Sequence, residues 1–291
     1  GVQALVVHGL RAEVIDEARR AGGQIYRRPP ARLAQRTART LYGFESKRAD
    51  AVHAAFDALR GSIEHHPDSL AWNAQDKVLD VMHNPTLGNR RVPYSHLIVA
   101  TGATDRVLPV PGWTLPGVYT LGGAQVALKF QGCAIGRRVV FMGTGPLLYL
   151  VAYQYAKAGV DVAAVLDTAR LADQIAAAPA MLAQPAVLAK GMYYVGWLRA
   201  LGVALHGGVR PLRVLGDEQQ GRVTSVAWLD GETERTIDCD AVGFGYALRS
   251  ETQLADLLGC RFDYAPLHRA HLPVRDAAGR SSVEGVYLAG D

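Results

Sequence analysis

The pattern of apolar and polar positions in the first sixty residues predicts a short helix, a buried strand and a longer helix. Residues 1–9 are typical of the end of a helix, with Gly9 as its stop signal. The short apolar run at 12–16 predicts a strand. Two adjacent glycines make 21–24 a loop, because glycine adopts backbone angles that other residues avoid. Residues 47–60 place Ala, Val, Phe and Leu at helical spacing among charged residues, which predicts a helix.

Several short strands, separated by turn residues, are predicted after the longer helix. They are expected at residues 62–64, 69–73, 77–82 and 95–100. Their length and spacing are typical of a small meander that is inserted before a core strand.

The clearest pattern lies near the middle of the chain. A compact apolar strand at 137–142 is followed by the turn Gly143–Pro146 and by a helix that ends at Gly159. The next apolar run, 160–166, predicts a strand that ends at Asp167. Strand, glycine-rich turn, helix and strand in this order form a βαβ unit.

The remaining pattern mixes helices and strands. Ala177–Leu201 is rich in Ala and Leu at helical spacing, and 251–259 predicts a short helix. Further strands are expected at 222–228, 234–244 and 283–289.

Composition and charge narrow the class of protein. The chain has 291 residues and is 49% hydrophobic, which is enough for a large core and for about two domains. The formal net charge is +4, and no long block of like charges occurs, which argues against a nucleic-acid groove. The weak positive balance favours anionic cofactors or partners.

The cysteines and the apolar runs indicate the cellular setting. Three widely spaced cysteines, Cys133, Cys239 and Cys260, argue against a disulfide framework and fit a reducing cytoplasm. No apolar run reaches the roughly 18 residues of a membrane span. The first residues lack the pattern of a signal peptide and an initiator Met, so we expect the true N-terminus to lie upstream.

The turn after the strand at 137–142 carries the best local motif, Gly143-x-Gly145-Pro146. A helix that starts there presents free N–H groups and a partial positive charge, which attract a pyrophosphate. Glycines let the backbone approach the phosphates closely. Asp167 lies near the roughly 20-residue offset at which an acid binds the ribose 2′-hydroxyl, which favours NAD over NADP.

This motif departs from the usual glycine pattern at one position. Leu148 replaces the third glycine, which normally lets the helix pack closely against the strand. We therefore expect the helix to sit differently. The alternative interpretation is a βαβ crossover that binds no nucleotide.

A second nucleotide unit is indicated at the start of the chain. Gly9 to Asp16 matches the end of a Rossmann helix and its second strand, so the glycine fingerprint is expected upstream of Gly1. Asp16, or else Glu17, would then hold the adenosine ribose of a first nucleotide. The alternative is an ordinary solvated acid at the end of a strand.

Two further strands end in residues that suit a bound cofactor. The strand that begins at Leu97 ends in Ala100-Thr101-Gly102, where small residues permit a close backbone approach and Thr can cap the turn. The last strand ends in Gly290-Asp291, whose acid could accept hydrogen bonds from a polyol or bind phosphate through water. Taken alone, each is only a strand that ends in a turn.

Taken in order, these pieces resemble the FAD-dependent pyridine nucleotide oxidoreductase superfamily, and the resemblance covers essentially the whole chain. It implies FAD as a cofactor and NAD at an inserted second unit. The residues that the resemblance implies for these two sites are Asp16, Ala100, Thr101, Gly102, Gly143, Gly145, Asp167, Gly290 and Asp291.

A closer resemblance rests on Gly22-Gly23-Gln24-Ile25-Tyr26-Arg27, on residues 108–118, on Gly143–Leu148 and on Thr252–Gly259. These segments resemble the α subunits of opine oxidases and of hydroxyproline or proline dehydrogenases, and a flavoprotein subunit of hydrogen cyanide synthase. The resemblance adds Gly22, Gly23 and Gln24 to the cofactor-binding residues. That subfamily habitually has Leu at the third glycine position.

The subfamily implies a heteromer. A separate flavoprotein β subunit dehydrogenates the amino acid, while the α subunit carries FAD and a second nucleotide site and handles electrons. A cysteine-rich iron–sulfur segment or protein often accompanies the α subunit, and this chain contains no such cysteine cluster.

The residues exclude some chemistry. Disulfide reductases need a redox-active cysteine pair near the flavin, and this chain has no C-x-x-C or C-x4-C pair. No side chain is identified as a catalytic acid or base. His268 and His271 are candidates for a position near the flavin, although both lie in a loop-like stretch. No spacing of His or Cys indicates a metal site.

Three functions remain as hypotheses: a flavoprotein subunit that transfers electrons, a self-contained NADH-dependent reductase, and a nucleotide-binding fragment without a cofactor. The predicted fold class is α/β, with two Rossmann-like three-layer nucleotide-binding domains. The FAD-type domain is expected at 1–112 and 243–291, and the NAD-type domain is inserted at 113–242. Because a phosphate loop is expected upstream, this chain alone is expected to bind FAD poorly.

Overall fold

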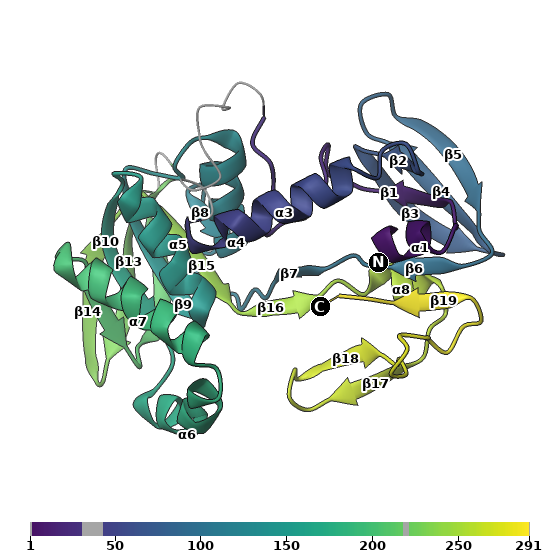
Figure 1. Cartoon of the computed structure of the whole chain (residues 1–291). Helices are drawn as coiled ribbons and strands as arrows, with labels where there is room; N and C mark the ends of the chain where they lie inside the picture. The colour runs from purple at the N-terminus through teal and green to yellow at the C-terminus, as the bar shows by residue number, and fades with distance from the viewer. Residues whose placement is uncertain (1, 31–42, 218–220, 291) are drawn as a thin grey trace. The chain divides into compact units, whose positions relative to one another are not determined.

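The computed structural model describes most of the chain (Figure 1). The described residues are 2–30, 43–217 and 221–290. The chain forms two compact units. Unit 1 comprises Gly1–Ala103 and Arg249–Asp291, and unit 2 is Thr104–Leu248. The chain passes between them twice, within the short strands β7 (Ala103–Asp105) and β16 (Leu248–Ser250).

Unit 1 contains two pairs of parallel strands. β1 (Ala12–Ile15) pairs with β2 (Ile63–His66), and β6 (Leu97–Val99) pairs with β19 (Val286–Leu288). The strand predicted at 62–64 is therefore not part of the meander, which is a correction to the expectation. β2 pairs in parallel with β1, and its buried residue, Ile63, is aligned with Ala12, the first residue of β1.

An antiparallel meander follows β2. Its strands, in spatial order, are β3 (Ser69–Gln75), β4 (Val78–His83) and β5 (Gly88–Pro93). β5 is not among the predicted strands, because only Val92 of its six residues is buried and the others give no apolar signal. The buried side chains of the meander are Ala74, Leu79, Val81 and Val92.

The other elements of unit 1 are short helices and a hairpin. They are α1 (Val2–Val7), η2 (Gly43–Glu45), α3 (Ser46–Asp57), α8 (Gln253–Leu257), β17 (Phe262–Ala265) and β18 (Ala270–Pro273). Gly9 follows α1 with a φ of +73°, in agreement with its predicted role as a stop signal. α3 confirms the helix that was predicted at 47–60.

Unit 2 is built on a five-stranded parallel sheet. Its strands, in spatial order, are β11 (Ala204–Gly207), β10 (Asp161–Asp167), β9 (Arg138–Thr144), β15 (Ala241–Tyr246) and β8 (Val118–Thr120). Its helices are α4 (Leu121–Val126), η3 (Ala127–Gln131), α5 (Pro146–Lys157), α6 (Leu171–Leu182) and α7 (Pro185–Ala200). An antiparallel sheet adds β12 (Arg210–Gly216), β13 (Val223–Asp230) and β14 (Thr233–Asp238).

Unit 2 has three layers, because the two faces of its parallel sheet pack against different partners. On one face, Phe141 packs with Leu148 and Tyr155 of α5. On the other face, Met142 packs with Val226 and Trp228 of the antiparallel sheet. β9 is buried on both faces, as is usual for a central parallel strand. The α/β class and the Rossmann-like layers confirm the predicted fold class.

Two predicted segments are each divided in the structure. The helical stretch at 177–201 is two helices, α6 and α7, and the second begins at Pro185, whose ring cannot continue a preceding helix. The run at 234–244 is two strands of different sheets, β14 and β15, which are separated at Cys239 and Asp240. Among the described residues, no helix is long and apolar enough to cross a bilayer.

The compact units divide at other residues than the predicted boundaries, 112/113 and 242/243. The carbonyl of Pro111 accepts a hydrogen bond from Val214 N at 2.8 Å, which ties the segment after β7 to β12. β15 crosses the second predicted boundary and pairs with both β9 and β8. Residues 104–112 and 243–248 therefore pack with unit 2.

The three cysteines differ in accessibility, which gives a direct test of the fold. Cys133 is exposed, whereas Cys239 and Cys260 are buried, and burial raises the pKa of Cys239 to about 12. We expect iodoacetamide at pH 8 to alkylate Cys133 in the native protein and all three cysteines in denaturant, as mapped by peptide mass spectrometry. Rapid labelling of Cys239 without denaturant would contradict the packing of β14 and β15.

Candidate functional site

The glycine-rich turn of unit 2 connects β9 to α5 and opens the helix as the sequence predicts. Gly145 is the N-cap residue, with a φ of +93°, and Pro146 occupies the first helical turn. Proline suits that position, since its missing N–H would have no partner inside the helix. A methyl group on Gly145 would meet no atom within 4 Å, so its backbone faces open space. This geometry fits a phosphate at the start of α5.

The motif suggests that Gly143 leaves room for a phosphate, but in the structure it leaves room for the neighbouring strand, β15. It has a φ of +142°, and a methyl group there would overlap the carbonyl group of Gly245 in β15. Its carbonyl accepts hydrogen bonds from Thr168 N at 2.8 Å and from the Thr168 hydroxyl at 3.1 Å. Gly143 therefore allows β9 and β15 to approach each other.

Leu148, at the position of the third glycine, is fully buried in the core between α5 and the sheet. The space between helix and sheet is thus filled by a leucine side chain. Leu148 is therefore a packing residue of α5, and the N-terminus of the helix stays open at Gly145.

The carboxylate of Asp167, at the end of β10, is held inside unit 2. Asp167 is aligned with Gly143 in the parallel pair and is only 4% exposed. Its Oδ2 accepts a hydrogen bond from the Tyr149 hydroxyl at 2.8 Å, and its Oδ1 accepts one from Ala169 N at 2.9 Å. Burial, followed by the neighbouring Asp167 carboxylate, raises the pKa of Tyr149 above its usual value, so Tyr149 remains a donor. The predicted ribose acid is therefore already engaged within the chain.

In unit 1, the predicted ribose acids follow β1. The backbone of Asp16 continues the pairing with β2 through a bond from its N–H to the His66 carbonyl, at 3.0 Å. Its carboxylate accepts a hydrogen bond from Ala18 N at 2.9 Å, which forms a tight turn. Glu17 is exposed. Both acids thus lie at the carboxyl end of a parallel strand, where α/β proteins bind ligands.

The Gly22–Tyr26 turn is held against α3. Gly22 has a φ of +140°, and a methyl group on it would overlap the carbonyl of Tyr26. That carbonyl lies 2.8 Å from Nε2 of His53 in α3. Gly23 has a φ of +57° and open space around its Cα, and Gln24 is exposed. Gly22 therefore shapes the turn, while Gly23 and Gln24 present it outward.

The other predicted flavin-site residues lie at the carboxyl ends of β6 and β19. Ala289 N donates to the Val99 carbonyl at 2.9 Å, so the two strand ends are side by side. The Thr101 hydroxyl, after Ala100, donates to the carbonyl of Glu251 at 2.7 Å and fixes the turn.

Two glycines at these strand ends leave room for a bound group. Gly102 and Gly290 have φ values of +76° and +91°, and a methyl group on either would meet nothing within 4 Å. This open backbone at the ends of parallel strands fits FAD. Asp291 lies outside the described residues.

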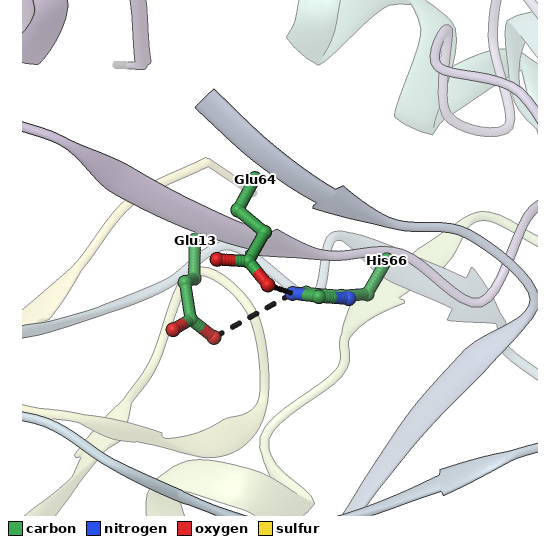
Figure 2. Close-up of side chains that lie close together, drawn as sticks. All are labelled: Glu13, Glu64 and His66. Atoms are coloured by element: carbon green, nitrogen blue, oxygen red, sulfur yellow. Dashed lines mark ion pairs between the residues drawn. The ribbon is translucent and has the colours of Figure 1, made fainter. Parts of the chain in front are cut away.

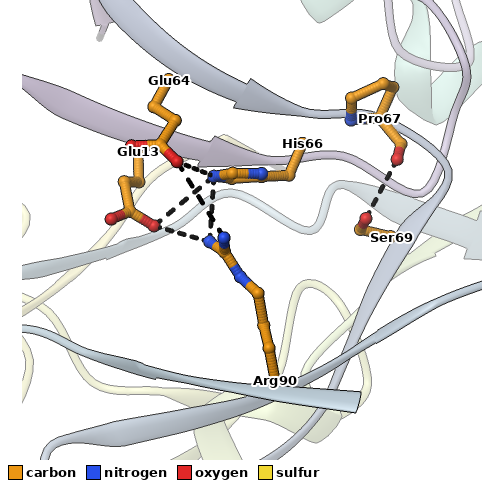
Figure 3. A network of polar contacts seen from close by, with 6 residues as sticks. All are labelled: Glu13, Glu64, His66, Pro67, Ser69 and Arg90. Carbon is orange, nitrogen blue, oxygen red and sulfur yellow. Dashed lines mark hydrogen bonds and ion pairs between the residues drawn. The ribbon is translucent and has the colours of Figure 1, made fainter. Parts of the chain in front are cut away.

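A charged network that the sequence analysis missed connects β1, β2 and β5 (Figures 2 and 3). Glu13 and Glu64 are paired residues of the two parallel strands, and His66 Nε2 lies 3.6 and 3.2 Å from their carboxylates. The three side chains are close enough to hold a metal ion. Arg90, however, places Nη2 2.8 Å from Glu13 Oε2 and 2.9 Å from His66 Nε2. The guanidinium lies within ion-pair distance of both acids, so the geometry supports a structural ion-pair network.

The two candidate histidines, His268 and His271, lie in the hairpin formed by β17 and β18. His271, in β18, packs its ring against Tyr264 of β17 at 5.3 Å. His268 lies in the exposed turn between these strands. A position near the flavin stays a prediction for both.

A β-α-β unit with a glycine turn, inserted into a second α/β unit whose strand ends are open, defines a two-domain dinucleotide-binding oxidoreductase. Residues 8–291 match the family model described as "Pyridine nucleotide-disulphide oxidoreductase". The chain belongs to this family of FAD-dependent oxidoreductases, which confirms the family that the motifs resemble.

Two relatives of this chain are components of multi-subunit enzymes. The chain is 35% identical to the A subunit of the opine oxidase of Agrobacterium tumefaciens (strain Ach5), over 97% of this chain and 56% of the relative. It is 33% identical to hydrogen cyanide synthase subunit HcnB of Pseudomonas aeruginosa, over 99% of this chain and 62% of the relative. The chain thus spans little more than half the length of these relatives.

Solved structures share the fold at low identity. A ferredoxin reductase from Rhodopseudomonas palustris superposes with a TM-score of 0.67 at 22% identity, over 99% of this chain and 63% of that one. L-proline dehydrogenase from P. horikoshii gives a TM-score of 0.66 at 17% identity, over 97% and 46% of the two chains. These likenesses support the fold alone.

Proposed function

We propose that the full-length protein is an FAD-containing subunit that passes electrons from a companion amino-acid-oxidising subunit to an acceptor. The observation that carries the proposal is the engagement of Asp167. In NADH-dependent enzymes the acid at this strand end hydrogen-bonds the ribose, whereas here it is buried and bound to Tyr149 and Ala169. We therefore propose that electrons reach the flavin from a source other than NADH.

The names of the relatives support the existence of a companion subunit. The opine oxidase and hydrogen cyanide synthase relatives are, by name, single subunits of larger enzymes. For this protein we propose a separate flavoprotein β subunit that dehydrogenates an amino acid or an opine. We also propose an iron–sulfur protein or segment as the next carrier, since a cluster usually takes four cysteine ligands and this chain has three cysteines.

We propose that unit 1 holds the FAD, which supplies the redox chemistry when it is bound. The acids after β1 suit the adenosine ribose, and the open glycine turns let backbone N–H groups face the cofactor. The proposed residues are Asp16, Glu17, Gly22, Gly23, Gln24, Ala100, Thr101, Gly102, Gly290 and Asp291.

One observation favours the alternative of a self-contained NADH-dependent reductase. The backbone of Gly145 is open at the start of α5, as a nucleotide phosphate requires. Under this alternative, Gly143, Gly145, Pro146 and Asp167 form the NAD site, and Asp167 exchanges Tyr149 for the ribose hydroxyls.

Anaerobic reduction of the full-length protein distinguishes these functions. Purified with its companion, it is expected to lose its flavin absorbance when an opine or L-proline is added and to retain it with NADH. Bleaching by NADH in the absence of a companion would favour the self-contained reductase. A protein without any flavin absorbance would contradict both the subunit and the reductase functions. A cofactor-free nucleotide-binding module would then be the remaining hypothesis.

A further inference from the structure

Helix α3 holds the Gly22–Tyr26 turn through the side chain of His53. The Tyr26 carbonyl can only accept a hydrogen bond, so Nε2 of His53, 2.8 Å away, carries the proton and donates it. Tyr26 N donates to the Gly22 carbonyl at 3.1 Å, which closes the turn on itself. A methyl group on Gly22 would overlap the Tyr26 carbonyl and lie 3.1 Å from His53 Nε2. Glycine at position 22 therefore makes room for the bond from α3.

Further bonds tie the turn and the residues after it to both ends of α3. At the start of the helix, the Tyr26 hydroxyl donates to Glu45 Oε2 at 3.2 Å. Farther along, Arg28 donates to the His53 carbonyl at 3.0 Å and to Asp57 Oδ2 at 2.9 Å. The Arg28 side chain is only 15% exposed. Its hydrogen bond lowers the pKa of Asp57, which keeps that carboxylate charged.

The helix itself is anchored on the parallel pair of β1 and β2. Phe56 of α3 packs edge-on to the ring of His65 in β2, with the ring centroids 5.1 Å apart. His53 and Phe56 lie on one side of α3, because residues three apart are neighbours on a helix. Ala49, one turn before His53, is buried. One side of α3 therefore contacts both the strand pair and the turn.

We propose that His53, supported by Arg28, is a positioning residue that holds the Gly22–Tyr26 turn in the shape that receives FAD. This inference rests on the proposed function, in which Gly23 and Gln24 contact the cofactor. Both are exposed, and Gly23 has open space around its Cα, so the bonds from α3 leave this part of the turn facing outward. A turn that is already ordered loses less conformational entropy when a ligand binds.

Titration of FAD into apoprotein prepared from the full-length protein, followed by flavin fluorescence, tests this role. His53→Leu removes the donor and leaves the Tyr26 carbonyl without it. This variant is expected to bind FAD about tenfold or more weakly, since ordering one backbone residue costs roughly that factor. His53→Gln carries an amide N–H that can replace Nε2 as the donor. It is expected to recover most of the affinity.

The two arginines that share Asp57 provide a matched comparison. Arg28→Leu removes two bonds to α3. Arg60→Leu removes only the contact to the other oxygen of Asp57, at 3.2 Å, which is made by a side chain that is 73% exposed. Arg28→Leu is expected to weaken FAD binding, whereas Arg60→Leu is expected to leave it unchanged. Equal FAD affinities of these two variants would overturn the proposal.

The unfolding temperature of each apoprotein variant separates positioning from a general loss of structure. If His53→Leu binds FAD weakly only because its unfolding temperature falls, and His53→Gln restores neither, the role of His53 is structural and the proposal is refuted. A His53→Leu protein that binds FAD as tightly as wild type would also refute it, while the proposed function would stand. A wild-type protein that binds no FAD would refute both.

Discussion

Replacing Gly143 by alanine is expected to disrupt the parallel sheet of unit 2. The added methyl group would overlap the Gly245 carbonyl in the neighbouring strand, and a φ of +142° is strained for any residue with a side chain. Backbone strain of about 1–3 kcal/mol adds to overpacking of about 1–3 kcal/mol. The sum is a large part of the stability of a domain, which is about 5–15 kcal/mol.

Hydrogen exchange of peptides from β9 and β15 measures this effect in the full-length protein. Gly145→Ala is the matched control two residues later, because its methyl group would meet open space. It is expected to cost about 1–3 kcal/mol of backbone strain and no overpacking. Similar protection of β9 and β15 in wild type and Gly143→Ala would contradict the close approach of these strands.

Replacing Asp167 by alanine is expected to destabilise unit 2 by about 2–4 kcal/mol, because it leaves the half-buried Tyr149 hydroxyl and the Ala169 N–H without their acceptor. Asp161→Ala, at the exposed start of the same strand, removes only a surface ion pair with Arg138. It is expected to cost about 0–1 kcal/mol. Urea unfolding of the two variants gives the comparison.

The same variants decide the role of the predicted ribose acid. A double-mutant cycle with Tyr149→Phe is expected to give a coupling of about 1.5–3 kcal/mol, as for a hydrogen bond to a charged group. If Asp167 instead serves chiefly to bind NAD, Asp167→Ala would retain wild-type stability and lose only its affinity for NADH. That outcome would remove the main support for the subunit proposal.

Local pattern was sufficient for the elements whose signal is contained in a short stretch of chain. The strand, glycine turn and helix from Arg138 to Lys157 are all found where they were predicted, since periodicity and glycine position report them directly. β5 could not be predicted from local pattern because it is mostly polar and forms only by pairing with β4. β2 was misplaced because its partner, β1, lies far away in the sequence.

The candidate site shows the same division. The open turn at Gly145 follows from the motif itself, whereas the demand on Gly143 comes from β15, about a hundred residues later. The bond from Tyr149 to Asp167 depends on how α5 packs on the sheet, for which the sequence gives no separate signal. Likewise, the pairing of Glu13 with Glu64 becomes visible only once β1 and β2 are aligned.

The absorbance spectrum of the purified full-length protein, with the released cofactor identified by chromatography, tests whether unit 1 binds a flavin. We expect a flavin band and about one FAD per chain, because unit 1 presents open strand ends of the kind that bind a dinucleotide. A protein that is colourless as purified, and that stays so after incubation with FAD, would contradict the claim that unit 1 is a flavin-binding domain.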